Sequence, residues 1–189
     1  APFGGTGARL GTNPISFAVP TDADHPIVLD FATSVVPEGK VRAAQYAGKS
    51  VPEGWLIDHK AQHSTNPEDL YGPPQGALLP FGGHKGFGLA LMVEALSGAL
   101  SGAGTCRDLN VTGDVQTDGV FMLAINIEAF CPRNLFTSQI RQLIEHVKTS
   151  PPSPGFDQIM VPGEPEARRK QQNIRDGVVI DDQTWQTVK

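Results

Sequence analysis

The stretch Phe81-Gly82-Gly83-His84-Lys85-Gly86-Phe87-Gly88 is the most specific local feature of the chain, with four glycines in the seven positions 82–88. Glycine permits positive φ angles and close backbone approach. An apolar helical stretch follows at once, so we expect a helix N-terminus with free N–H groups and partial positive charge here, beside the full charge of Lys85. These features suit a phosphate or pyrophosphate. The pattern is neither a Walker A loop nor a dinucleotide fingerprint, and on spacing alone a tight turn with a solvated lysine explains it too.

The apolar residues 86–103 predict a helix directly after this loop. Glu94 is the only charged residue in that stretch. A helix that is apolar on almost every side is expected to be buried in a larger structure. Gly98 and Gly102 lie four residues apart on one face and would let another backbone approach closely. The charge of Glu94 and the polar flank favour a core helix over a membrane helix.

Working outward from this helix, the alternation of elements predicts the α/β class. The patterns predict strands over residues 13–20, 27–31, 119–127, 159–161 and 178–180, and helices over residues 39–47, 137–150 and 166–175. Thr33 or Ser34 would cap the first of these helices. Residues 48–80 are rich in proline and glycine and are expected to be mostly loop.

Asp30 is the second candidate site residue. It lies near the end of the compact apolar run 27–31, which predicts a buried strand. Its carboxylate would accept hydrogen bonds from a ribose or a nicotinamide amide, or orient a catalytic histidine. Alternatively it would cap the turn at residues 32–34.

Composition narrows the class of protein. The 189 residues can form one sizeable core, and 39% hydrophobic and 19% charged residues indicate a globular chain. A net charge of -5 argues against a nucleic-acid surface, although a few cations would still hold an anionic ligand. Two cysteines indicate reduced thiols, and the five histidines form no convincing metal set. We find no apolar run long enough for a membrane span and no signal peptide, so we expect a cytoplasmic protein without a metal.

Five motifs together resemble the malate/L-lactate dehydrogenase family, which also includes ureidoglycolate and sulfolactate dehydrogenases. The order and spacing of the motifs match along nearly the whole chain. The matching stretches are Gly11-Thr12-Asn13-Pro14-Ile15, Leu29-Asp30-Phe31-Ala32-Thr33-Ser34, Val51-Pro52-Glu53-Gly54-Trp55-Leu56-Ile57-Asp58, the segment of residues 78–89 around Lys85, and Val161-Pro162-Gly163-Glu164-Pro165-Glu166.

The resemblance implies a mixed, largely antiparallel sheet flanked by helices, a non-Rossmann NAD(P)-binding fold, and usually a homodimer. It implies NAD or NADP as cofactor. By motif, the nicotinamide side would be contacted by Asp30, Phe31 and Ala32, the phosphates by Lys85 with Gly83 and Gly86 of its loop, and another part of the cofactor by Pro162, Gly163 and Glu164. Thr12 and Asn13 are weaker candidates for the pocket wall, and Asp58 for an orienting carboxylate.

Family members are nearly twice this length, and their catalytic histidine and substrate-binding arginine come from the N-terminal half. We therefore expect residues 1–189 to be the cofactor-binding C-terminal part, with no catalytic residue of its own. The whole enzyme would transfer hydride between NAD(P)H and a small 2-oxo acid, and this part alone would be inactive. The rival interpretation is a non-catalytic dinucleotide-binding or assembly module. Glu38 and Asn66 depart from the family pattern in turns, where they bear on substrate preference.

Overall fold

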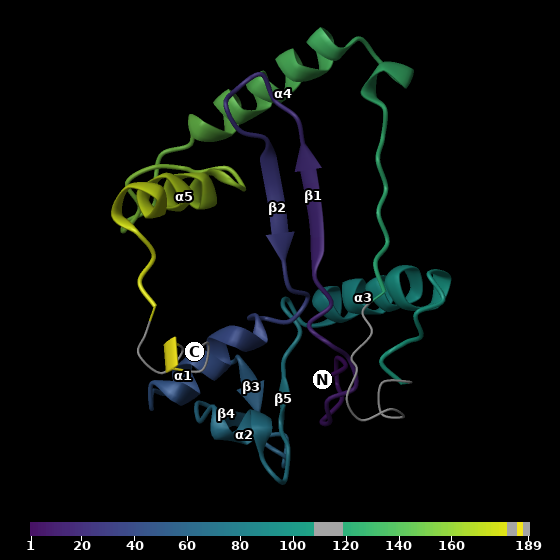
Figure 1. The fold of residues 1–189 in the computed structure, drawn as a ribbon, viewed down its shortest axis with the longest axis vertical. Helices are drawn as coiled ribbons and strands as arrows, with labels where there is room; N and C mark the ends of the chain where they lie inside the picture. Colours follow the sequence, from purple (N-terminus) through teal and green to yellow (C-terminus); the bar gives the residue numbers. More distant parts are fainter. Residues whose placement is uncertain (108–118, 181–184, 187–189) are drawn as a thin grey trace. The chain divides into compact units, whose positions relative to one another are not determined.

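The computed structural model describes residues 1–107, 119–180 and 185–186, and the chain divides into two compact units (Figure 1). Unit 1 comprises Ala1–Ile15 and Asp30–Met122, and unit 2 comprises Ser16–Leu29 and Leu123–Lys189. Helices alternate with small sheets, and the pairings in the three-stranded sheet are antiparallel. This mixture agrees with the predicted α/β class.

Unit 1 is built around a three-stranded sheet. Strand β3 (Leu56–Ile57) lies between β4 (His63–Ser64) and β5 (Ala77–Leu78) and pairs with both in antiparallel register. Helices α1 (Glu38–Tyr46) and α2 (Glu68–Tyr71) add side chains to the same core. The buried core cluster consists of Val36, Val41, Val51, Leu56 and Leu70. The predicted first helix and the loop-rich character of the following segment are thus confirmed, although Pro37, rather than Thr33 or Ser34, precedes α1.

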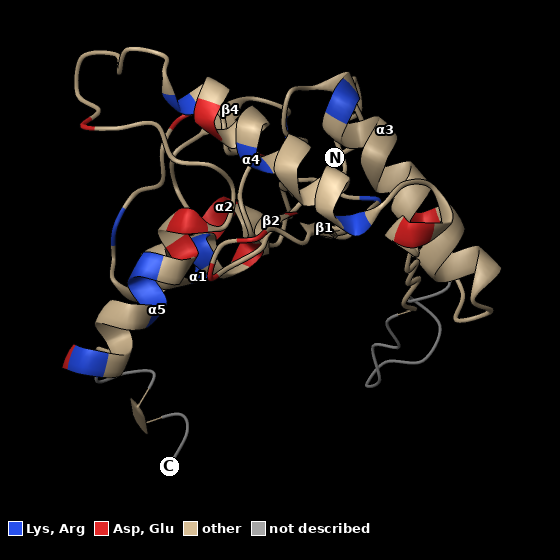
Figure 2. Cartoon of the chain, turned by 90° about the horizontal axis from the view of Figure 1, so that it is seen from above, with Lys and Arg blue, Asp and Glu red and all other residues tan. Residues whose placement is uncertain are grey.

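The helix that follows the glycine loop is present but less buried than expected. It consists of α3 (His84–Val93), followed without a break by the π-helix η1 (Glu94–Leu100). In Figure 2 this helix is tan apart from one blue and one red segment, which correspond to its two charged residues, Lys85 and Glu94. Its buried residues are Gly86, Ala90 and Gly98, and four of its large apolar side chains are exposed: Leu91, Met92, Leu96 and Leu100. An apolar composition indicates that a helix requires other elements to cover it. Whether such elements pack against the helix depends on the rest of the structure.

Gly98 makes the close approach that its sequence position suggested. A Cβ there would lie 2.5 Å from the backbone oxygen of Gly104. Gly102 has open space around it instead, and its positive φ of 77° fits a helix end. Within the described ranges, no helix has the length and apolar content that crossing a bilayer requires.

Strands β1 (Ile15–Val19) and β2 (Ile27–Phe31) form a two-stranded sheet in which the chain runs up one strand and down the other (Figure 1). Both strands were predicted. The expected burial of residues 27–31 is wrong, because no residue of β2 is buried and Leu29 is 41% exposed. A two-stranded sheet covers neither of its own faces, so apolar residues on it stay accessible.

Unit 2 contains helices α4 (Arg133–Lys148) and α5 (Glu164–Asp176) and the short 3-10 helix η3 (Ile127–Ala129). Both α-helices were predicted. Helix α4 begins four residues before the expected range 137–150 and ends two residues before its end, and α5 extends beyond the expected range 166–175 at both ends. Helix α5 begins after Gly163, whose φ is 95°, and ends before Gly177, whose φ is 87°. Positive φ at these two glycines stops the helical path at each end. An ion pair between Arg141 and Asp22 joins α4 to the loop after β1.

Three predicted strands are absent from the described residues. The segments are 119–127, 159–161 and 178–180, and none of them pairs with another strand there. Residues 119–126 follow an extended path in Figure 1 and lead into η3. A strand requires hydrogen bonds to a neighbour as well as β-branched and apolar residues. The local sequence has the right residue types, but it does not determine whether a neighbouring strand is present to pair with.

Candidate cofactor site

The glycine loop before α3 closes on itself. Gly82 and Gly83 have φ angles of 55° and 62°, which favour glycine over other residues. The backbone N–H of Gly86 donates to the Phe81 oxygen at 2.9 Å, and the N–H of Phe87 donates to the Gly83 oxygen at 3.2 Å. The expected row of free N–H donors is therefore only partly present, and the charge of Lys85 is the main attraction for an anion.

Lys85 is free to bind an anion. Its side chain is exposed, and in the described part of the chain no carboxylate lies within ion-pair distance of its ammonium group. A carboxylate beside the ammonium group would partly neutralise its charge and compete with a ligand for it. This ammonium group is thus available to a ligand.

The residues 30–32 lie beside this loop within unit 1. The N–H of Phe81 donates to the Thr33 oxygen at 3.1 Å, and the N–H of Val35 donates to the Leu79 oxygen at 2.8 Å. The rings of Phe31 and Phe81 meet edge to face with their centroids 5.3 Å apart. Two groups of predicted site residues, far apart in sequence, therefore form one surface.

Asp30 is exposed, next to Phe31 on strand β2. No hydrogen bond or ion pair engages its carboxylate in the ranges that the structure describes. The alternative that Asp30 caps the turn at residues 32–34 is therefore wrong. Its oxygens are free to accept hydrogen bonds from a ligand.

Gly86 lies where the backbone after β2 approaches the start of α3 closely. A Cβ at this residue would lie 2.6 Å from the Thr33 oxygen and closer still to the Phe81 oxygen. Both atoms belong to the backbone, so neither can rotate away. The absence of a side chain at position 86 is what allows the two segments to dock.

Thr33 joins these segments, a role that its place in a sequence motif did not indicate. It is 1% exposed. Its hydroxyl donates to the backbone oxygens of Thr12 and Asn13, both at 2.9 Å, and its N–H donates to the Thr12 oxygen at 2.9 Å. Thr33 was expected to be a helix cap, and it is instead a buried junction between three loops.

Replacing Thr33 with valine is expected to lower the free energy of unfolding by about 1 to 3 kcal/mol, because the partly buried Asn13 carbonyl loses this donor and the Thr12 carbonyl keeps only the Thr33 N–H. Urea unfolding followed by circular dichroism measures this change. Thr65→Val, at an exposed threonine of the same unit, is the control and should change stability little. Equal effects of the two substitutions would contradict the role of Thr33.

Thr12 and Asn13 were the weaker pocket candidates. The Asn13 side-chain amide donates to Glu94 Oε1 at 2.8 Å and to the Ala90 oxygen at 3.1 Å. Asn13 also has a φ of 39°, which is unusual for a residue with a side chain. Its amide nitrogen is thus engaged within unit 1, whereas the hydroxyl of Thr12 lines a cavity.

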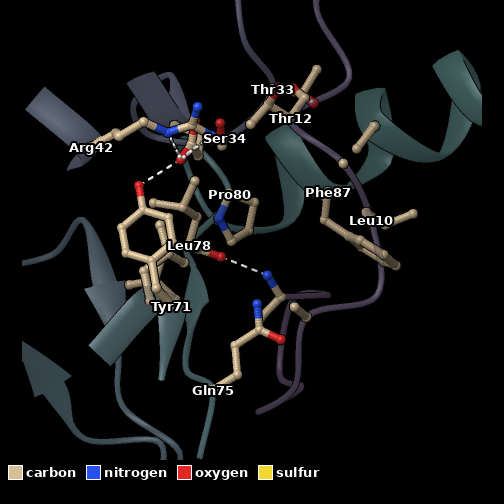
Figure 3. Close-up of a pocket in the computed structure, with 17 residues that line it drawn as sticks. Leu10, Thr12, Thr33, Ser34, Arg42, Tyr71, Gln75, Leu78, Pro80 and Phe87 are labelled. Carbon is tan, nitrogen blue, oxygen red and sulfur yellow. Dashed lines mark hydrogen bonds and ion pairs between the residues drawn. The ribbon is translucent and has the colours of Figure 1, made fainter. Parts of the chain in front are cut away.

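That cavity measures about 500 Å³ and lies wholly in unit 1 (Figure 3). One wall carries a cluster of Glu38, Arg42 and Tyr71. The Tyr71 hydroxyl donates to Glu38 Oε1 at 2.5 Å, and Arg42 Nε donates to the same oxygen at 3.1 Å. Burial, together with the Glu38 carboxylate, raises the pKa of Tyr71 to about 12. Glu38, which departs from the family pattern, therefore has a local structural role between α1 and α2.

Asp58 does not present its carboxylate to the site. Its Oδ1 accepts the backbone N–H groups of Lys60 and Gln62, both at 2.8 Å. These hydrogen bonds, with that from Gln62 the stronger cause, lower the pKa of Asp58. The carboxylate closes its own turn, as aspartate often does. Within the described ranges, no three His, Cys, Asp or Glu side chains gather closely enough to hold a metal ion.

The turn of Pro162, Gly163 and Glu164 is fixed within unit 2. The N–H of Val28 donates to the Pro162 oxygen at 3.1 Å, and a Cβ at Gly163 would lie 3.0 Å from that same nitrogen. Glu164 forms an ion pair with Lys148 and accepts the Val161 N–H at 3.0 Å. The turn is therefore attached to β2 on one side and to α4 on the other.

The charge state of Glu164 links this turn to pH. Burial alone would raise its pKa, but the hydrogen bonds from Lys148 and Val161 outweigh burial and lower the pKa below the usual 4.5. A carboxyl group whose pKa is lowered on folding stabilises the fold above its unfolded pKa. That stabilisation is lost as the pH falls through the folded pKa.

Replacing Glu164 with glutamine should therefore destabilise the fold at neutral pH, by at most about 1 kcal/mol for a partly exposed pair. The difference from wild type should shrink below pH 4.5. Thermal unfolding measured across this pH range tests it. Glu166→Gln, at an exposed carboxylate of the same helix, is the control. A Glu164 difference that is constant with pH would contradict the assignment.

Comparison with known proteins covers the whole chain. The family model described as malate/L-lactate dehydrogenase matches residues 1–189. The chain is 40% identical to a malate dehydrogenase of Pyrococcus horikoshii in an alignment of 188 positions that covers 95% of the chain and 51% of that protein. It is 36% identical to an L-lactate dehydrogenase of Cupriavidus necator in an alignment of 190 positions that covers 100% of the chain and 54% of that protein.

A solved structure agrees with the sequence comparisons. The crystal structure of malate dehydrogenase from Entamoeba histolytica superposes with a TM-score of 0.86 at 26% identity, covering 96% of this chain and 57% of the other. The chain thus spans about half the length of the relatives that it matches. Because the family model matches from the first residue to the last, the chain belongs to the malate/L-lactate dehydrogenase family.

Proposed function

We propose that this chain is the cofactor-binding C-terminal part of an oxidoreductase that transfers hydride between NAD(P)H and a small 2-oxo or 2-hydroxy acid. One observation carries the proposal. In unit 1 the loop that carries the unpaired ammonium group of Lys85 is hydrogen-bonded to the segment that follows Asp30, and the Asp30 carboxylate has no partner among the described residues. A cation suits the diphosphate of a dinucleotide, and a carboxylate suits the hydroxyl and amide donors of its other parts.

The other residues of this surface fit a dinucleotide as well. Gly83, with its positive φ, and Gly86, whose missing side chain lets the Phe81 and Thr33 oxygens approach, give the loop the shape that carries Lys85. Phe31 and Ala32 offer an apolar edge beside the charged groups, as small-molecule sites commonly do. The bound cofactor would supply the hydride, and these residues would hold and orient it.

The family resemblance supports a second set of contacts. It assigns Pro162, Gly163 and Glu164 to another part of the cofactor, and Thr12 and Asn13 to the wall of the site. We also propose a non-Rossmann fold, in keeping with a glycine loop that lacks the dinucleotide fingerprint.

The substrate and the assembly are proposed on the same ground. The relatives named above are an L-lactate dehydrogenase and malate dehydrogenases. Hydride transfer to a 2-oxo acid needs a proton donor at the oxygen and a cation at the carboxylate. The family resemblance assigns both to the N-terminal half of such enzymes. We propose that the enzyme is a cytoplasmic homodimer and that residues 1–189 alone are inactive.

The test is to express the protein as encoded in full and to measure oxidation of NADH and NADPH with a panel of 2-oxo acids that includes pyruvate and oxaloacetate. We expect turnover with at least one acid and a preference for one of the two cofactors. Binding of a dinucleotide without turnover of any 2-oxo acid would instead favour the non-catalytic module. Activity of the isolated 189-residue chain would contradict the proposal that residues 1–189 alone are inactive.

A further inference from the structure

Glu94 stands at the point where α3 passes into η1. It is the only charged residue between Gly86 and Ala103. π-helical turns occur often at functional sites. Placing a carboxylate on an apolar helix costs free energy unless hydrogen-bond donors satisfy its oxygens. The donors to Glu94 therefore indicate its role.

Both Glu94 oxygens accept hydrogen bonds from outside the helix. Oε1 accepts from Asn13 Nδ2 at 2.8 Å, and Oε2 accepts from the Cys106 N–H at 2.8 Å. The Asn13 bond holds a residue whose φ of 39° is unfavourable for an L-amino acid. Strained residues of this kind persist only where neighbouring contacts hold them.

These contacts close a ring of hydrogen bonds within unit 1. The backbone oxygen of Asn13 accepts from the Thr33 hydroxyl, the Thr33 oxygen accepts from Phe81 N, and the Phe81 oxygen accepts from Gly86 N. Gly86 belongs to the same continuous helix as Glu94, whose carboxylate returns the ring to Asn13. Thr33 directly follows residues 30–32, and Gly86 directly follows Lys85. The ring thus holds the segment that follows residues 30–32 against the loop that carries Lys85.

We propose that Glu94 is a positioning residue for the dinucleotide site and acts through Asn13 and Thr33 without touching the cofactor. The inference rests on the proposed function. Without the Glu94 carboxylate, Asn13 relaxes toward negative φ, and its carbonyl moves away from the Thr33 hydroxyl. The segment of residues 30–32 then loses its fixed place relative to Lys85, and an ordered site becomes a mobile one that binds the dinucleotide less tightly.

A reversal of the hydrogen bond tests this directly. Asn13→Asp places two carboxylates against each other and should weaken NADH binding by about 10-fold, or about 1.4 kcal/mol. Glu94→Gln should weaken it less. The double variant Asn13→Asp/Glu94→Gln should restore the affinity to within about 3-fold of wild type. In the double variant the introduced amide donates to the introduced carboxylate, and its oxygen still accepts from the Cys106 N–H. The Asn13 hydrogen bond to the Ala90 oxygen is not restored, which is why the expected rescue is not complete.

The measurement is fluorescence titration of the full protein with NADH and with NADPH, well below the unfolding temperature of each variant. Glu53→Gln, at an exposed carboxylate of unit 1, is the matched control and should leave the dissociation constant unchanged. If Asn13→Asp does not fold, Glu94→Gln and the double variant still give the comparison.

The outcomes separate this inference from the proposed function. Weakened binding that the double variant rescues supports the positioning role. Unfolding temperatures that fall while the dissociation constants stay unchanged would overturn it, because Glu94 would then stabilise the fold only. A wild-type protein that binds neither NADH nor NADPH would overturn both the inference and the proposed function.

Discussion

Replacing Lys85 with alanine is expected to raise the dissociation constants of both NADH and NADPH by about 10- to 100-fold. The estimate follows from the roughly 1.5 to 3 kcal/mol that a hydrogen bond to a charged group contributes. The ammonium group is exposed and has no carboxylate partner in the described ranges, so its removal costs the ligand a cation and costs the fold little. Fluorescence titration on the full protein gives the two constants.

Two comparisons make the Lys85 result specific. Lys85→Arg keeps the charge and should retain most of the affinity, whereas Lys49→Ala removes an exposed lysine of the same unit and should have no effect. The affinity of wild type should also fall more steeply with added salt than that of Lys85→Ala, because salt screens an exposed charge. Equal binding by wild type and Lys85→Ala would show that this lysine does not hold the cofactor.

The second large effect concerns the glycine that follows Lys85. Gly86→Ala is expected to lower the free energy of unfolding by about 3 kcal/mol, the upper part of the range for overpacked buried positions. The new methyl group would meet the backbone oxygens of Thr33 and Phe81, and neither can turn aside. Moving them would separate the loop from the segment after β2. Urea unfolding gives the loss of stability, and NADH titration should show weaker binding.

The matched control lies two residues away on the same helix. A methyl group at Gly88 would have nothing within 4 Å. Gly88→Ala should therefore leave stability unchanged or raise it by about 0.5 to 1 kcal/mol, since alanine favours a helix more than glycine does. If Gly86→Ala proved as stable as Gly88→Ala, the close approach at position 86 would not be what joins the two segments.

The outcomes of the two substitutions differ in kind. Lys85→Ala should change binding and leave unfolding unchanged, whereas Gly86→Ala should change both. This contrast separates the charge that attracts the ligand from the backbone docking that sets its place. The Glu94 variants fall between them, because they should alter the placement while keeping both the lysine and the glycine.

Local sequence determined the elements whose hydrogen bonds are made within a single segment. The helices α1, α3, α4 and α5 were all predicted, because periodic apolar residues and flanking glycines or prolines act over a few neighbouring positions. The strands β1 and β2 were also predicted from their residues, although their hydrogen bonds join two segments. The glycine loop and the family motifs could likewise be found from residue order alone. They named Lys85, Asp30 and Gly86 as site candidates.

Only the tertiary structure decided which of these residues meet and which groups remain free. Hydrogen bonds between segments distant in sequence form the junction at Thr33 and the ring through Glu94 and Asn13. The closed turn at Asp58 depends on local geometry that residue spacing does not reveal. The predicted burial of residues 86–103 and the predicted strand at residues 119–127 were wrong for the same reason. Burial and strand pairing depend on other segments of the chain. A local pattern indicates that a segment requires such a partner but does not determine which segment provides it.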